Sequence, residues 1–136
     1  MELLACVINV IVKERAVASA ICDKYGCTYK CRGRACYITI TSKDVETHNR
    51  IVADLQNLAT VLNKWISIKQ VFRFKAQGRI IVRPWLYQTG SRQYFGRPND
   101  KVFIAIEEYS DGANIICGGA DYETCRQYVL SVLSPN

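Results

Sequence analysis

The sequence lacks any hydrophobic run long enough to cross a membrane. A spanning helix needs roughly 20 apolar residues, whereas the longest apolar run, Leu3–Val12, has ten residues and is interrupted by Asn9. No basic segment precedes this run and no small-residue cleavage site follows it, so it does not have the pattern of a secretory signal. We therefore expect a cytoplasmic protein with no membrane partner, whose seven cysteines are reduced.

Histidine is nearly absent, which leaves few candidate catalytic groups. The single histidine, His48, falls on the apolar stripe of an expected helix, where a histidine is more often an interior residue than a general base. No nucleophile motif such as G-x-S-x-G occurs. We expect a non-enzymatic protein that needs no cofactor.

Paired cysteines with zinc-binding spacing are also absent. Cys22, Cys27, Cys31 and Cys36 are separated by four, three and four residues, and no C-x-x-C pair occurs among them. We expect buried or half-buried thiols and no metal. A two-residue turn at Gly33-Arg34 would place Cys31 opposite Cys36, where the pair could oxidise to a cross-strand disulfide.

Composition and periodicity predict one α+β domain over residues 1–136. With 49% hydrophobic and 22% charged residues, the chain has the amino-acid composition of an ordinary globular domain. We expect an antiparallel sheet with two or three packed helices and a ferredoxin-like strand–helix–strand–strand–helix opening. The expected strands are Leu3–Val12, Cys27–Arg32, Ala35–Ser42, Ile68–Lys75, Arg79–Tyr87, Lys101–Glu108 and Asn114–Cys117. The expected helices are Glu14–Tyr25 (stopped by Gly26), Asp44–Ile66 (capped by Ser42) and a last helix from Asp121, and a polar loop is expected over Gln88–Asp100.

The second expected helix has the clearest pattern. Apolar side chains recur at spacings of three and four, which predicts one buried stripe. The stripe comprises Val45, His48, Val52, Leu55, Ala59, Leu62 and Ile66.

Acidic residues are missing between Leu55 and Asn99. Residues 1–99 hold sixteen Lys/Arg against six Asp/Glu, a balance of +10, and residues 100–136 hold two against six, a balance of −4. Cations neutralise phosphates and exposed aromatic rings stack on unpaired bases. We predict a nucleic-acid-binding face formed by Lys69, Arg73, Lys75, Arg79, Arg83, Arg92, Arg97, Trp85 and Tyr94, together with Arg32 and Arg34 at a hairpin tip.

A different interpretation of this segment is open. The aromatic residues could pack in the core while the cations form a solvated face that pairs with the acidic C-terminal third.

The segment Ala18–Gly26, followed by two expected strands and a long helix, faintly resembles the opening of the LAGLIDADG family of DNA endonucleases. Its small residues and final glycine fit the close helix packing of that family. The metal-binding acid expected just before the glycine is Tyr25 here. The resemblance covers roughly a third of the chain and implies a domain that binds DNA without cutting it.

Three functions therefore stay open. The first is a non-enzymatic protein that binds nucleic acid or a nucleoprotein, such as an accessory protein of a virus or mobile element. The second is a protein-interaction or inhibitor module that docks an acidic partner surface. The third is a small nucleotide-binding protein or enzyme whose site is shared across a homodimer.

Overall fold

The computed structural model describes residues 2–75, 86–89, 92–95, 102–109, 111–119 and 127–130. The elements in chain order are β1 (Glu2–Val12), α1 (Arg15–Tyr25), β2 (Tyr29–Arg32), β3 (Ala35–Ser42), α2 (Val45–Leu62), β4 (Ile66–Lys75), β5 (Leu86–Thr89), β6 (Arg92–Phe95), β7 (Val102–Tyr109) and β8 (Gly112–Gly119). Residues 127–130 are also helical. The expected α+β class is confirmed. No helix in these described ranges is long and apolar enough to span a membrane.

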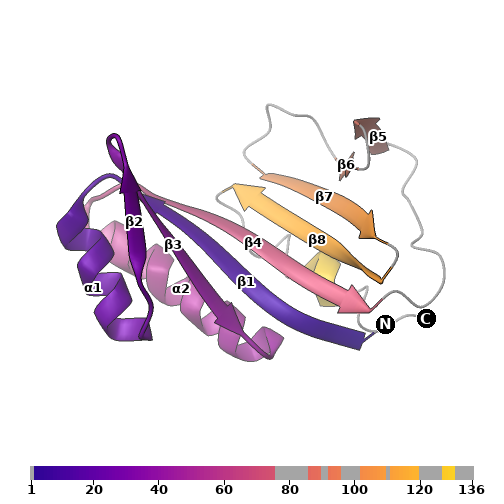
Figure 1. Ribbon diagram of the computed structural model, residues 1–136, viewed down its shortest axis with the longest axis horizontal. Coiled ribbons are helices and arrows are strands. Elements are labelled where there is room, and N and C mark those ends of the chain that lie inside the picture. The colour runs from indigo at the N-terminus through magenta and orange to yellow at the C-terminus, as the bar shows by residue number, and fades with distance from the viewer. Residues whose placement is uncertain are drawn as a thin grey trace.

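The described strands form one antiparallel sheet in the order β2-β3-β1-β4-β8-β7-β6-β5. The first six elements run strand–helix–strand–strand–helix–strand, and α1 and α2 lie on the same face of the sheet (Figure 1). The expected ferredoxin-like opening is therefore confirmed. Beyond β4, the same sheet continues into β8 and β7.

Strand alternation directs two sets of apolar side chains toward the helices. The first cluster joins Ile8, Val10 and Val12 of β1 to buried residues of α1, β3 and α2. The second lies under β4, β7 and β8, where Phe72 and Phe74 pack with Val129 of the helical segment. For these two phenylalanines, the interpretation that the aromatics fill the core is confirmed.

The end of α1 confirms one prediction, and the start of α2 corrects another. The expected stop of α1 is confirmed, because Gly26 adopts the left-handed conformation (φ 65°). The expected cap of α2 at Ser42 is wrong, because Ser42 still pairs with Cys6 in the sheet. Asp44 caps the helix instead, and its side chain accepts a hydrogen bond of 2.7 Å from the Thr47 N–H.

Helix α2 ends at Leu62, four residues before the predicted end, and Asn63 adopts the left-handed conformation there. The apolar stripe is confirmed at Val52 and Leu55, which are buried. It is wrong at Leu62, which is 41% exposed. Ile66 belongs to β4 rather than to the helix.

The expected polar loop over Gln88–Asp100 is wrong in its first half. Strands β5 and β6 pair there as an antiparallel hairpin. Polar side chains do not prevent pairing, because backbone groups make the ladder. Most of the strand expected over Arg79–Tyr87 and the start of the helix expected from Asp121 lie outside the described residues.

The hairpin of β2 and β3 has the expected two-residue turn, with Gly33 at φ 59°. Cys31 lies opposite Cys36 and the two are joined by a disulfide, and Cys117 is also disulfide-bonded. Cys6, Cys22 and Cys27 are free. The expectation of reduced thiols is therefore wrong for Cys31, Cys36 and Cys117. Between Cys31 and Cys36, the tight turn brings two facing sulfurs within bonding reach.

Candidate nucleic-acid interface

The candidate interface is the sheet face turned away from α1 and α2. Because side chains alternate along a strand, every second residue of β1, β3 and β4 points to this face. Lys69, Arg73 and Lys75 share it, as their spacing predicts. On β7 and β8 this face is not accessible to solvent, since Ala105 and Ile116 are buried there. The accessible part therefore extends from β2 to β4.

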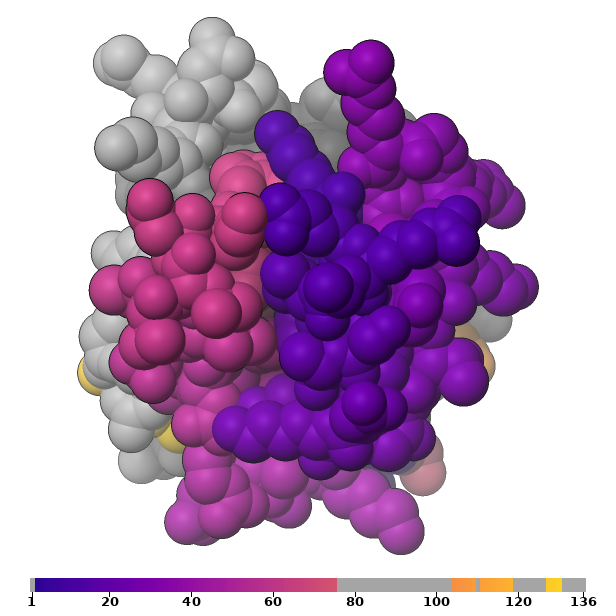
Figure 2. All heavy atoms as spheres, turned by 90° about the vertical axis from the view of Figure 1, so that its left-hand side faces the viewer, coloured from indigo at the N-terminus to yellow at the C-terminus, as the bar shows by residue number. Residues whose placement is uncertain are grey.

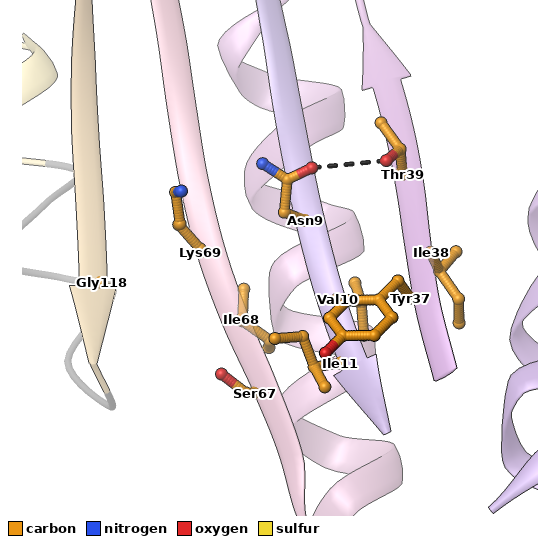
Figure 3. Close-up of a pocket in the computed structure, with 10 residues that line it drawn as sticks. All are labelled: Asn9, Val10, Ile11, Tyr37, Ile38, Thr39, Ser67, Ile68, Lys69 and Gly118. Carbon is orange, nitrogen blue, oxygen red and sulfur yellow. Dashed lines mark hydrogen bonds between the residues drawn. The ribbon is translucent and has the colours of Figure 1, made fainter. Parts of the chain in front are cut away.

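Two cross-strand rows make up the centre of this accessible part. One runs from Lys30 through Tyr37 and Ile11 to Ser67. The next runs from Thr39 through Asn9 and Lys69 to Gly118. Neither row contains an acidic residue. Between them the surface is hollowed into an open depression of about 500 Å³, lined by β1, β3, β4 and Gly118 of β8 (Figure 3).

Tyr37 is the exposed aromatic residue of the depression. It is 45% exposed, although its strand β3 lies between β2 and β1 and is not at the edge of the sheet. Its strand neighbours Cys36 and Ile38 are buried on the helix side. The ring therefore offers a surface on which a flat ligand can stack.

Two cations flank Tyr37 on the same face. Lys30 lies directly opposite Tyr37 on the edge strand β2, and Lys69 lies on β4 at the other side of β1. Both are exposed. Among the described residues, the structure records no ion pair for either lysine. Their charges are therefore open to an anionic ligand.

Arg73 differs from these lysines because it is engaged within the protein. Its guanidinium lies 3.0 Å from an Asp111 carboxylate oxygen and 3.4 Å from Oδ1 of Asn114, and 5.8 Å from the ring centre of Tyr109. This contact is the pairing with the acidic C-terminal third that the alternative interpretation expects. Lys75 is exposed and lies opposite Glu2, the first residue of β1.

The other predicted site residues lie farther out or outside the described ranges. Arg32 ends β2, and Arg34 lies in the exposed turn beside it. The backbones of Arg92 and Tyr94 pair with Glu107 and Ala105 at the opposite end of the sheet. The remaining predicted residues, Arg79, Arg83, Trp85 and Arg97, lie outside the described residues.

Sequence reasoning missed Tyr37, Asn9 and Thr39, which line the depression. The signal was strand parity: Tyr37 and Thr39 alternate with buried Cys36, Ile38 and Ile40. Asn9 is the polar residue that interrupts the longest apolar run.

His48 lies on the other side of the sheet and is completely buried. Its Nε2 lies 2.8 Å from Oε1 of Gln70, and its ring is 4.4 Å from that of Phe72. Burial lowers the pKa of His48, so the ring is neutral near pH 7. Asp44, which could have paired with it, instead caps α2. His48 therefore cannot reach a ligand on the candidate interface.

The parts of the chain that the structure describes contain no cluster of three or more His, Cys, Asp or Glu side chains able to hold a metal ion. Comparison with known proteins found no matching family model, no similar curated protein and no similar solved structure.

Proposed function

We propose that this protein binds single-stranded nucleic acid on the accessible sheet face, as a binding protein rather than an enzyme. One observation carries the proposal: Tyr37 is exposed on the accessible sheet face, between two lysines that make no ion pair with any described residue. The proposal moves the centre of the interface from the predicted stretch around Arg73–Arg97 to the rows around Tyr37 and Lys69.

The chemistry of the face fits an unpaired strand. An aromatic ring stacks on the free face of an unpaired base, which a duplex does not present. Lys30 and Lys69 lie on either side of the ring and can neutralise successive parts of a phosphate backbone. A duplex groove is read by a projecting helix or ribbon, whereas this part of the sheet is hollowed (Figure 3).

The direct test is fluorescence anisotropy with labelled single-stranded DNA and RNA at low salt. Base stacking on an aromatic side chain contributes about 1–3 kcal/mol. Tyr37→Ala should therefore weaken binding roughly 5- to 150-fold. Tyr37→Phe, which keeps the ring, should bind nearly as the parent does.

Trp65→Ala is the matched control, because Trp65 is a similarly exposed aromatic residue (53%) outside the depression. This variant should retain parental affinity. The proposal is wrong if the parent binds no single-stranded nucleic acid at low salt, or if Tyr37→Ala and Trp65→Ala lose affinity equally.

A second candidate function, docking of an acidic protein partner, is favoured by the corner where α1 begins and α2 ends. Val61, Leu62 and Trp65 are exposed there. The ammonium of Lys13 lies 5.0 Å from the Trp65 ring centre, and Lys64 pairs with Glu14 at 2.8 Å. Figure 2 shows the indigo start of α1 beside the rose segment that follows α2. Apolar side chains flanked by cations suit an amphipathic acidic segment.

This second function predicts a different response to substitution. Trp65→Ala should weaken binding of a leucine- and glutamate-rich peptide, while Tyr37→Ala should leave it unchanged. No observation on the described residues favours the third function, a nucleotide or catalytic site shared across a homodimer.

A further inference from the structure

Asn9 is the one polar residue in the otherwise apolar run Leu3–Val12 of the central strand β1. Its neighbours Ile8 and Val10 are buried against the helices, and Asn9 points to the opposite, accessible face. There it lies between Thr39 of β3 and Lys69 of β4 (Figure 3). An apolar residue would suit a central strand better, so the amide calls for a separate explanation.

The side chain of Asn9 contacts Thr39 through its amide oxygen. The Thr39 hydroxyl donates a hydrogen bond of 3.4 Å to Oδ1 of Asn9 (Figure 3). Oδ1 keeps a second lone pair, because an amide oxygen accepts two hydrogen bonds. The structure records no hydrogen bond from Nδ2 to any described residue. Toward the described residues, Asn9 therefore presents a free amino group and a free acceptor lone pair side by side in the depression.

The depression also holds an aromatic ring, a cation and a glycine near this amide, which together could contact the base and the phosphate of a nucleotide. Tyr37 is diagonal to Asn9 across β3 and β1, since Tyr37 lies opposite Ile11. Diagonal neighbours of a sheet are about 7–8 Å apart, so one flat ligand can contact both side chains. Lys69 lies directly opposite Asn9, and Gly118 beyond it has no side chain to fill the space.

We propose that this depression seats one unpaired adenine, with its face on Tyr37 and its edge on Asn9. The inference rests on the proposed function. The N7 atom of adenine accepts from Nδ2, and the N6 amino group donates to Oδ1. Guanine presents two acceptors, O6 and N7, at the same edge. Its O6 would face Oδ1 of Asn9, so the amide discriminates against guanine. Lys69 contacts the phosphate of the seated nucleotide.

The experiment compares two short, labelled, thymidine-rich oligonucleotides that carry one central adenine or one central guanine. A bidentate amide contact discriminates by about 1–3 kcal/mol, so the parent should bind the adenine oligonucleotide roughly 5- to 150-fold more tightly. Asn9→Ala should bind both oligonucleotides equally. Asn9→Asp, which keeps the acceptor for Thr39 and for N6 but offers no donor to N7, should weaken binding of both oligonucleotides. The same two oligonucleotides made as RNA show whether the preference for adenine also holds when the sugar is ribose.

Thr41→Ala is the matched control, because Thr41 is exposed on the same strand and face as Thr39 but outside the depression. It should keep the full preference for adenine. If the parent binds both oligonucleotides equally or prefers guanine, the inference fails while the proposed function stands. If Asn9→Ala folds, binds more weakly, and still prefers adenine, Asn9 only supports the strand and the inference also fails. Absence of binding to either oligonucleotide overturns the proposed function itself.

Discussion

His48 shows what burial does to a single ionisable side chain. The ring is enclosed with Gln70 and Phe72 and has no acidic partner among the residues that the structure describes. Burial disfavours the charged form and lowers the pKa of the folded state below the ordinary value of 6.5, whereas the hydrogen bond to Gln70 offsets this only in part. The unfolded chain therefore binds a proton at His48 at a higher pH than the folded protein does.

Stability should consequently fall as the pH decreases from about 6.5 toward the folded pKa of His48. One differential proton changes the free energy of unfolding by up to about 1.4 kcal/mol per pH unit. Urea unfolding at pH 7 and pH 5 should show this loss in the parent. His48→Gln should be less stable than the parent at pH 7, and its loss between the two pH values should be smaller.

The difference between the parent and His48→Gln reports on histidine titration at this position alone, because His48 is the only histidine in the sequence. Acids such as Asp44, whose pKa is lowered by its hydrogen bonds to Thr47, titrate alike in both proteins. Equal pH dependence in parent and variant would show that the His48 ring accepts a proton in the folded state at an ordinary pKa.

At the scale of elements, α2 contributes its middle rather than its end to the core. Leu55 is 1% exposed and packs with α1, β1 and β3, whereas Leu62 is exposed at the last turn. Leu55→Ala should lower the free energy of unfolding by about 2–5 kcal/mol, the range for truncating a buried leucine. Leu62→Ala, the matched control in the same helix, should cost at most about 0.5 kcal/mol. Equal losses measured by urea unfolding would place both side chains in the core.

The elements were largely predictable because their signals are local. A run rich in Val and Ile predicted β1, and alternation predicted β3. The glycine after Tyr25 predicted the end of α1, and a two-residue turn predicted that Cys31 lies opposite Cys36. The end of α2 was not predictable from periodicity, because Leu62 continues the apolar spacing. The left-handed conformation of Asn63 ends the helix there, and asparagine carries a weaker stop signal than glycine.

The site was less predictable than the fold. A segment without acidic residues shows where the cations are but not which acids pair with them. Asp111 is far from Arg73 along the chain, and the pairing of β4 with β8 brings the two side chains into contact. The depression depends on which strands are neighbours. Asn9, Tyr37 and Lys69 come from three strands, and only the order β3-β1-β4 brings them together. Nothing in the spacing of these residues along the chain shows that order.

For the whole molecule, the uneven charge of the sequence has two different consequences. Some of the cations pair with acids of the same chain, as Arg73 of β4 does with Asp111 beside β8. Others, represented by Lys69 in the depression and Lys30 opposite Tyr37, make no ion pair with the described residues. The net charge of +6 alone does not distinguish these two populations.

The salt dependence of binding distinguishes them. The logarithm of the binding constant for a single strand falls with the logarithm of salt concentration by about 0.7 for each phosphate that is neutralised. Lys30→Gln and Lys69→Gln should each weaken binding and reduce the steepness of this line by about 0.7, and the double variant by about twice as much. Arg73→Gln should leave the slope within error of the parent, because its guanidinium already contacts Asp111.

Anisotropy titrations of these four variants over a series of salt concentrations measure the slopes directly. Lys24→Gln is a further control, since Lys24 pairs with Asp54 at 3.6 Å on the helix side of the sheet. If Arg73→Gln lowers the slope as much as Lys69→Gln does, the bound strand extends along β4 and displaces Asp111 from Arg73. If neither Lys30→Gln nor Lys69→Gln changes the slope, phosphates bind elsewhere, and the face around Tyr37 is not the electrostatic centre of the interface.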